Sequence, residues 1–322
     1  MNKSLDLSHE QSEENNKEYL YIINYPSFEE ELCRMEMKYV FGIVPKKKYF
    51  FSNDYITPSR SPFIKQCLSV IYSGDNVEEI VRKIKENNLS YENFKVCYIK
   101  IGQEDVNYAE QLAILRDIGF VINGFADIHN PEILLGISKV ENKWIFGVYE
   151  KNDYLWHAHD KKPYSYSNGL GLRMAKAIVN IAVGNELNRT VIDPCCGVGT
   201  VVIEGLDLGV EIKGYEINPS IGQNAKENLG FFRYKDVITI GDMHNIKDSY
   251  DVAIVDIPYG LFSPTTVEEQ KNIIETSRRI AKKMIIITFE DMDNHVNAAG
   301  FHIIDKCSVS KGSFKRYITV CE

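Results

Sequence analysis

The second half of the chain alternates short apolar runs with amphipathic stretches. An apolar run, Thr190–Ile192, ends at Asp193, and a glycine-containing turn leads into a helical pattern over residues 201–208. Later apolar runs predict strands at 213–217, 237–240, 251–257, 283–289, 301–307 and 317–320. Apolar runs separated by helical patterns predict an α/β fold with a doubly wound, largely parallel sheet. The last two runs predict an antiparallel hairpin whose tip, residues 311–316, lies near the substrate.

The first half predicts a separate, smaller α+β unit over residues 19–150. Helices are expected at 27–42, 61–74, 75–84 and 108–119, and strands at 19–24, 49–52, 96–101, 120–128, 133–140 and 143–149. Ser27 and Glu30 have the spacing of a capping box, in which each side chain bonds a free backbone N–H at the start of a helix. A linker is expected at 151–168, followed by the second domain at 169–322.

Composition fits a globular enzyme of two domains. Of the 322 residues, 44% are hydrophobic and 25% are charged, and no apolar run approaches the roughly 20 residues of a membrane helix. Residues 1–18 are polar and acidic without an apolar signal core, so a disordered tail and a cytoplasmic location are expected. The seven cysteines include no C-x-x-C pair, which favours reduced thiols.

The net charge of −8 argues against a broad nucleic-acid surface, although a local basic patch is sufficient for binding. The tail carries part of this deficit, since residues 1–18 hold two lysines against five acids and the rest of the chain stands at −5. Candidate patches are residues 46–48, Arg60 with Lys65, and residues 161–162.

The glycine turn indicates a nucleotide-like ligand without phosphates. Residues 193–200 read DPCCGVGT, not G-x-G-x-x-G, and Asp193 puts a negative charge where a pyrophosphate would lie. Glu216 ends the next strand, at the position where an acid accepts ribose hydroxyls. A cationic or zwitterionic ligand such as S-adenosylmethionine fits better than NAD. Asp242, after the third strand, is expected to accept the adenine amino group, or alternatively to cap a turn with Met243.

Residues 256–260 read DIPYG at the end of a buried-type strand. This segment resembles the D/N-P-P-Y/F motif of S-adenosylmethionine-dependent amino-methyltransferases. The resemblance implies that the Asp256 carboxylate and the Ile257 carbonyl accept the two N–H groups of an exocyclic amine, and that Tyr259 stacks on its base. Those bonds would orient the amine and strengthen as charge develops on nitrogen. Ile257 departs from the motif, which has proline there, and this puts catalysis in question.

A second resemblance is to the tRNA guanosine-N2-methyltransferases that carry a THUMP domain. Residues 162–182, KPYSYSNGLGLRMAKAIVNIA, are similar to the segment before and within that family's first methyltransferase helix, and residues 124–131 are similar to a strand end in its THUMP region. The resemblance covers roughly residues 90–290. It implies a class I methyltransferase sheet in the order 3-2-1-4-5-7-6, a THUMP-like RNA-binding front domain, and Tyr164 and Ser167 near the cofactor.

The expected site has two parts. The catalytic residues are Asp256, Ile257, Pro258 and Tyr259. The cofactor-binding residues are Tyr164, Ser167, Asp193, Cys195, Gly197, Gly199, Thr200, Glu216, Ile217, Asp242 and Met243. The expected activity is transfer of a methyl group from S-adenosylmethionine to guanine N2 in tRNA, with RNA as partner.

Other interpretations remain open. The same catalytic domain can act on adenine N6 or on a protein amide, and a non-catalytic protein can keep the cofactor cavity. No metal is expected. His157 and His159 are two residues apart, so on a strand they would point away from each other, and no Cys or Glu cluster completes a metal site.

Overall fold

The computed structural model describes residues 17–102, 106–166, 169–258, 265–311 and 314–322, without the side chains of 311 and 314. Within these residues the chain forms two compact units. The first unit comprises residues 17–21, 50–56 and 67–150, and the second comprises 22–49, 57–66 and 151–322. Among the described helices, none has the length and apolar character needed to cross a membrane.

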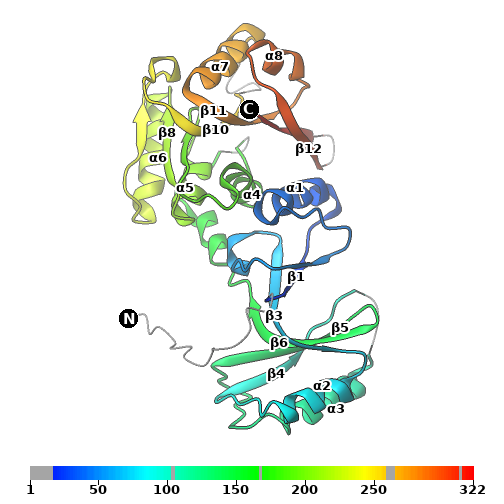
Figure 1. Ribbon diagram of the computed structural model, residues 1–322. Helices are drawn as coiled ribbons and strands as arrows, with labels where there is room; N and C mark the ends of the chain where they lie inside the picture. The colour runs from blue at the N-terminus through cyan, green and yellow to red at the C-terminus, as the bar shows by residue number, and fades with distance from the viewer. Residues whose placement is uncertain (1–16, 103–105, 167–168, 259–264, 312–313) are drawn as a thin grey trace. The chain divides into compact units, whose positions relative to one another are not determined.

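A six-stranded sheet with two helices on it forms most of the first unit. Its strands run in the order β2-β1-β3-β6-β5-β4, and Figure 1 shows α2 and α3 on one face. The elements are β1 (Tyr19–Ile23), β2 (Tyr49–Ser52), β3 (Ile64–Gly74), α2 (Val77–Glu86), β4 (Phe94–Tyr98), α3 (Tyr108–Gly119), β5 (Ile133–Val140) and β6 (Lys143–Lys151). Ile80, Ile118, Leu135 and Phe146 are fully buried in the core between helices and sheet. The α+β class expected for the first half is therefore correct.

Three local expectations in the first half are wrong. Residues 64–74 form strand β3, not a helix, because the β-branched and aromatic residues of this segment pair between two other strands. Residues 120–128 form turns with isolated bridges instead of a strand. The capping box is not formed, since the short helix η1 (Ser27–Glu29) precedes α1 (Glu30–Phe41) and neither start has a side-chain cap.

The second unit is built on a seven-stranded sheet in the order β12-β13-β11-β10-β7-β8-β9. Numbered along the chain within this sheet and followed from β9, the order reads 3-2-1-4-5-7-6. The strands are β7 (Thr190–Asp193), β8 (Glu211–Glu216), β9 (Ile238–Ile240), β10 (Tyr250–Asp256), β11 (Ala281–Thr288), β12 (Ile303–Lys311) and β13 (Phe314–Cys321). β7 to β11 pair in parallel, and β13 is antiparallel to both β11 and β12.

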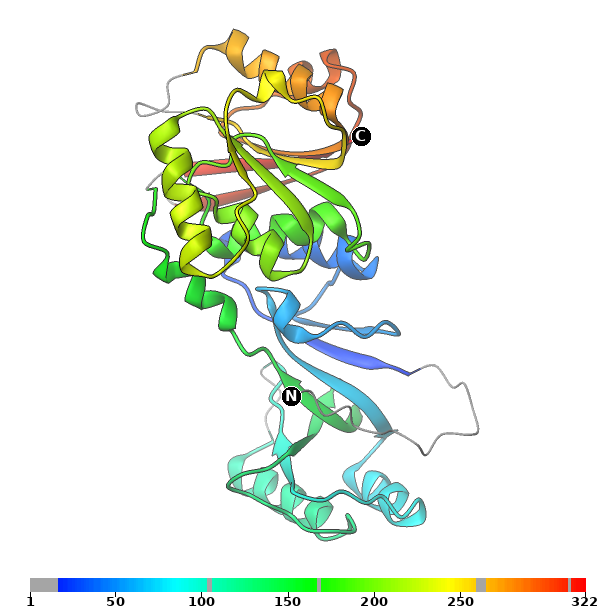
Figure 2. The same cartoon turned by 90° about the vertical axis from the view of Figure 1, so that its left-hand side faces the viewer.

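Helices cover both faces of this sheet. They are α4 (Leu172–Val183), α5 (Thr200–Asp207), α6 (Pro219–Phe231), α7 (Val267–Ile280) and α8 (Asp293–Ala298). In Figure 1, α7 and α8 lie above the strands and α4 and α5 lie below, and Figure 2 shows the same two layers from the side. The main core beside β10 and β11 includes Ala253, Val255 and Met284, all fully buried. Ile254, between the first two, is also fully buried. The expected α/β class is confirmed.

Helix α1 belongs to the second unit, although it lies in the first half of the sequence. It packs on α4 and β12. Glu31 accepts hydrogen bonds from the backbone and side chain of Ser308, and Lys38 pairs with Asp305 at 2.8 Å. The structure therefore corrects the expected domain over residues 19–150, because 22–49 and 57–66 pack with 151–322. Of the expected tail, residues 1–16 lie outside the described residues.

Candidate functional site

Four neighbouring parallel strands of the second unit end at, or just before, an acidic residue. β7 ends at Asp193, β8 at Glu216 and β10 at Asp256, and Asp242 follows two residues after β9. Ligands of open α/β sheets bind outside the carboxyl ends of the strands, where the direction of strand order reverses. A cavity of about 650 Å³ lies there and is lined by all four acids.

The glycine turn after β7 is shaped by two glycines with positive φ. Gly197 has φ 54° and Gly199 has φ 81°, a region that other residues rarely adopt. The Gly197 N–H donates to the Glu216 carboxylate at 3.0 Å, and the Asn218 N–H donates to the same carboxylate at 2.8 Å. In a phosphate-binding turn the corresponding N–H would donate to a phosphate of the ligand, whereas here the Gly197 N–H already donates to Glu216. The turn therefore favours a ligand whose groups near Glu216 are hydroxyls.

Five carboxylates line the cavity: Asp193, Glu216, Asp242, Asp256 and Glu269. Burial raises the pKa of Asp193 well above its ordinary value, and the charges of Asp256 and Glu216 raise it further. Among the described lining residues the only basic side chain is His244. A cationic ligand would relieve this repulsion, and an anionic ligand would add to it.

Asp256 is the acid with an unsatisfied buried oxygen. Burial raises its pKa to about 7, and the positive charge of Arg316 acts in the opposite direction. Its Oδ1 is buried and has no hydrogen-bond partner among the described residues. A buried acceptor without a donor is costly unless a ligand supplies one. This oxygen is therefore available to accept an N–H group from a substrate.

Ile257, where the motif has proline, makes a bond that proline cannot make. Its N–H donates to the Ile287 carbonyl of β11 at 3.1 Å, which extends the pairing of β10 and β11 by one residue. Its side chain is buried at 3% exposure in the core. The hydrogen bond restrains the backbone at this position in place of the proline ring.

The cavity brings together most of the expected site residues. Those that line it are Asp193, Cys195, Gly197, Thr200, Glu216, Ile217, Asp242, Met243, Asp256, Ile257 and Pro258. Ser167 and Tyr259 lie outside the described residues. Asp242 also accepts the His244 N–H at 2.8 Å, so it caps a short turn as well as facing the cavity.

Two expected cofactor residues do not line the cavity. The backbone of Tyr164 is bonded to Asn228, and a hydrogen bond from its hydroxyl to Glu227 raises the pKa of Tyr164, so its side chain is held at α6. Gly199 forms the N-cap of α5 and faces Leu229 and Ala225. Gly199 therefore shapes the turn without facing the ligand.

The structure adds cavity residues that sequence reasoning missed. They are Tyr166, Gly169, Leu170, Pro194, Cys196, Val198, Val201, Asn218, Ile221, His244, Thr265, Glu269 and Ile273. Several lie next to expected residues and could have been found by proximity. Thr265 lies just before α7 and Glu269 and Ile273 lie on it, and no sequence pattern shows which face of that helix meets the cavity.

A second cavity, of about 410 Å³, lies at the start of β10 and β11. Its walls include Asp251, Lys282 and Lys283. The Lys283 ammonium donates to the carbonyls of Ile181 and Ala182 at the end of α4, so its charge stabilises that helix end. Because this cavity is at the amino ends of the strands and has charges of both signs, the acidic cavity is the candidate site.

Comparison with known proteins relates the chain to methyltransferases. Residues 160–291 match the family described as RMKL-like, methyltransferase domain. This part of the chain is a methyltransferase domain. It contains the glycine turn and the four acid-ended strands, β7 to β10, of the seven-stranded sheet, whose order is the one that the family resemblance implied.

Similar curated proteins include two archaeal enzymes, each named tRNA (guanine(10)-N2)-dimethyltransferase. The protein from Pyrococcus abyssi is 24% identical over 78% of this chain and 81% of its own length. The protein from Methanothermobacter thermautotrophicus is 24% identical over 62% of each chain, so less than two thirds of that relative is spanned. A solved structure of TrmN from Thermus thermophilus aligns with 95% of this chain at 15% identity and a TM-score of 0.44.

Proposed function

We propose that this protein transfers a methyl group from S-adenosylmethionine to an exocyclic amine of RNA, most specifically guanine N2 in tRNA. The observation that carries the proposal is Asp256, whose unpartnered buried Oδ1 faces the same cavity as the glycine turn and Glu216. The choice of guanine N2 in tRNA as the substrate rests on the relatives that are named as tRNA guanine-N2 enzymes.

The acidic cavity supports this cofactor over NAD. S-adenosylmethionine carries a sulfonium and an ammonium group, and both are stabilised by the surrounding carboxylates. Glu216 still has lone pairs for ribose hydroxyls after accepting two backbone N–H groups. Asp193, almost fully buried beside the turn, is proposed to lie near the methionine end of the ligand. No metal takes part in this reaction.

The chemical role of Asp256 follows from its charge. As a carboxylate it accepts one N–H of the amine, and the Ile257 carbonyl accepts the other, so the nitrogen lone pair is directed at the methyl group. Positive charge develops on nitrogen in the transition state, and both bonds strengthen. Pro258 follows two residues after the end of β10. Tyr259, outside the described residues, is proposed to stack on the base.

The first unit is proposed to be THUMP-like and to hold folded RNA by shape and phosphate contacts. Residues 169–322 are proposed as the methyltransferase domain together with the segment before it. The location is proposed to be cytoplasmic, where tRNA is modified.

The first test is incubation of the purified protein with radiolabelled S-adenosylmethionine and tRNA from a strain lacking the protein, followed by nucleoside chromatography. Label in N2-methylguanosine is the expected result. Label in N6-methyladenosine would favour the alternative base. Retention of full activity by Asp256→Ala would contradict the proposed role of the carboxylate.

A non-catalytic cofactor-binding protein is the second candidate, and the replacement of proline by Ile257 is the observation behind it. Measuring cofactor binding and methylation side by side distinguishes the enzyme from the binding protein. Binding of S-adenosylhomocysteine by calorimetry without methylation of any tRNA would favour the binding protein, whereas turnover would exclude it.

A further inference from the structure

Residues 155–166 run along the second unit between β6 and α4, and we call them the strap. They begin with the short helix η3 (Leu155–Lys161) and end at Tyr166, which lines the acidic cavity. Trp156 and His159 are buried, at 4% and 5% exposure. A connecting segment with buried side chains is fixed to its surroundings.

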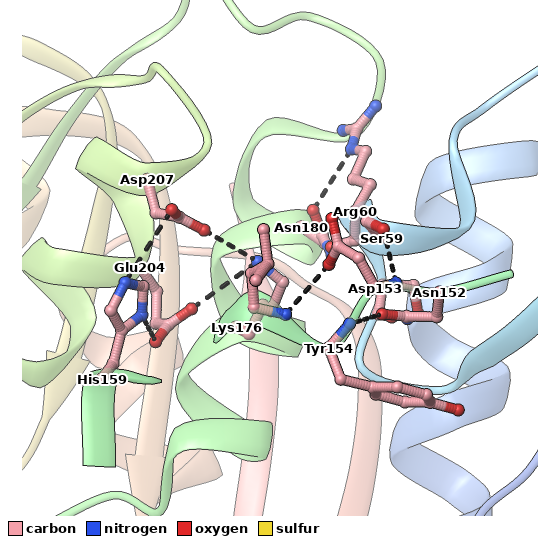
Figure 3. Close-up of polar contacts among 12 residues, drawn as sticks. Ser59, Arg60, Asn152, Asp153, Tyr154, His159, Lys176, Asn180, Glu204 and Asp207 are labelled. Atoms are coloured by element: carbon pink, nitrogen blue, oxygen red, sulfur yellow. Dashed lines mark hydrogen bonds and ion pairs between the residues drawn. The ribbon is translucent and has the colours of Figure 1, made fainter. Parts of the chain in front are cut away.

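The first fastening is a buried polar cluster around His159. Its Nδ1 lies 2.7 Å from Glu204 Oε1, and its Nε2 lies 3.8 Å from Asp207. Lys176 of α4 completes the cluster, at 3.2 Å from Asp207 and 3.7 Å from Glu204. Figure 3 shows these four side chains pointing toward one another, with the two acids coming from α5. In the tautomer that carries its proton on Nδ1, His159 donates this hydrogen bond to Glu204.

His159, Glu204 and Asp207 bring their ligand atoms within 4.8 Å of one another, a spacing that a metal ion could bridge. The two acids lie against opposite nitrogens of one imidazole. The ammonium of Lys176 already occupies the position between the carboxylates. The sequence showed no Cys or Glu cluster beside the histidine pair, but the fold brings Glu204 and Asp207 against His159.

The second fastening is Asn228 of α6, whose side chain is fully buried. It accepts the Tyr164 N–H at 2.9 Å and donates to the Tyr164 carbonyl at 2.9 Å. The same amide donates to the Val198 carbonyl at 2.9 Å, and Val198 lies in the glycine turn and lines the cavity. One side chain therefore ties the strap to the turn that faces the ligand.

We propose that the strap positions the wall of the cofactor cavity, and that His159 and Asn228 are its positioning residues. The inference rests on the proposed function. Both fastenings act on one segment, which brings Tyr166 to the cavity two residues after the Asn228 contact. Loosening either one allows the Tyr166 side of the wall to move away from the glycine turn, without removing any group that touches the ligand.

The first experiment measures the dissociation constant of S-adenosylhomocysteine by calorimetry for the full chain. His159→Phe keeps an aromatic ring but removes both nitrogens, and it is expected to weaken binding about tenfold. His159→Asn keeps a donor near the position of Nδ1 and is expected to recover most of that loss. The matched control is His157→Phe, an exposed neighbour in the same short helix, which should bind as the wild type does.

The second experiment uses Asn228→Ala, which removes all three bonds and is also expected to weaken binding about tenfold. Its control is Lys226→Ala on the same helix, where only an exposed ion pair with Asp236 is lost. If both fastenings act through one strap, the double variant His159→Phe/Asn228→Ala should lose less than the product of the two single losses.

Every measurement is made well below the melting temperature of each variant, which circular dichroism provides. A purely structural role would lower that temperature and leave the dissociation constant unchanged, and this result in both single variants would overturn the inference. If His159→Phe does not fold, His159→Asn and Asn228→Ala decide the question. Failure of the wild type to bind would instead overturn the proposed function.

Discussion

At the scale of single residues, the second unit contains carboxylates whose burial raises their pKa. Burial raises the pKa of both Asp256 and Glu36 to about 7. Asp256 faces the cavity and has an oxygen without a described partner. Glu36 lies away from the cavity and accepts from Ser61 and Asn180, each at 2.6 Å. Both raised pKa values make stability depend on pH, and the shift at Asp256 also has a chemical consequence.

Activity should rise with pH through about 7, because only the ionised form of Asp256 accepts the amine N–H with a full negative charge. Asp256→Asn accepts through its amide oxygen at every pH. We expect its kcat/KM to be lower by about a hundredfold and to lose this acid limb. Asp251→Asn, at the far end of the same strand, is the control. An unchanged acid limb in Asp256→Asn would assign it to another group.

Stability should fall as pH rises from about 4.5 to 7, because of Glu36. A pKa raised from 4.5 to about 7 means that the folded protein binds the proton more tightly than the unfolded chain. The contribution is present below pH 4.5 and is lost as pH rises through about 7, and it is worth roughly 3 kcal/mol. Glu36→Gln should flatten this dependence in urea unfolding between pH 5 and 8. An equally steep dependence in the variant would show that Glu36 does not cause it.

At the scale of elements, the candidate site lies at the ends of the parallel strands. One backbone hydrogen bond holds the end of β10 in position. Ile257 N–H pairs with the Ile287 carbonyl just beyond the last β10–β11 pair. In the motif a proline ring restrains the backbone at this position. In this chain a hydrogen bond between β10 and β11 restrains it instead.

Restoring the motif with Ile257→Pro should destabilise the protein by about 1–3 kcal/mol, because the Ile287 carbonyl loses its donor and the buried side chain becomes smaller. Urea unfolding measures this cost. Ile257→Val, which keeps the N–H, is the control and should cost about 1 kcal/mol. Methyl transfer should continue, since the carbonyl at position 257 remains. Equal stability of the proline variant and the wild type would show that the bond contributes nothing.

At the scale of the whole molecule, the methyltransferase unit is discontinuous in sequence. Helix α1 contributes the buried side chains of Leu32, Cys33, Met37 and Val40, and its Glu36 accepts from Asn180 of α4. Another discontinuous segment holds Arg60, which donates to Asn180 and is drawn beside it in Figure 3. Lys65 and Asn152 are joined by a backbone hydrogen bond of 3.0 Å, so the chain leaves and re-enters this unit at adjacent points.

A chain of residues 151–322 should not fold, because it exposes the surface of α4 that α1 covers. Four fully buried side chains at about 1.5–3 kcal/mol each approach the whole stability of a typical domain. A chain that joins Gln66 to Lys151 through a short Gly-Ser linker keeps the complete second unit. It should fold and bind S-adenosylhomocysteine. Cooperative unfolding of the 151–322 fragment would contradict this account.

The sequence by itself determined the parallel sheet of the second unit and predicted most of the strand-end residues that line its cavity. Strand, glycine turn and helix are local patterns, and an acid at the end of each parallel strand must reach the same edge of the sheet. Asp193, Glu216, Asp242 and Asp256 were therefore found without coordinates, and so was the preference for a cationic cofactor.

Only the tertiary structure decided the rest, because those features depend on contacts between distant segments. Residues 64–74 carry apolar side chains compatible with helix or strand, and pairing with β1 and β6 selects the strand. The membership of α1 in the second unit depends on burial against α4. The strap depends on the contacts of His159 with Glu204 and of Tyr164 with Asn228, which are 45 and 64 residues further along the chain. Local pattern contains no information about such partners, since their free energy comes from packing and buried hydrogen bonds formed only in the folded chain.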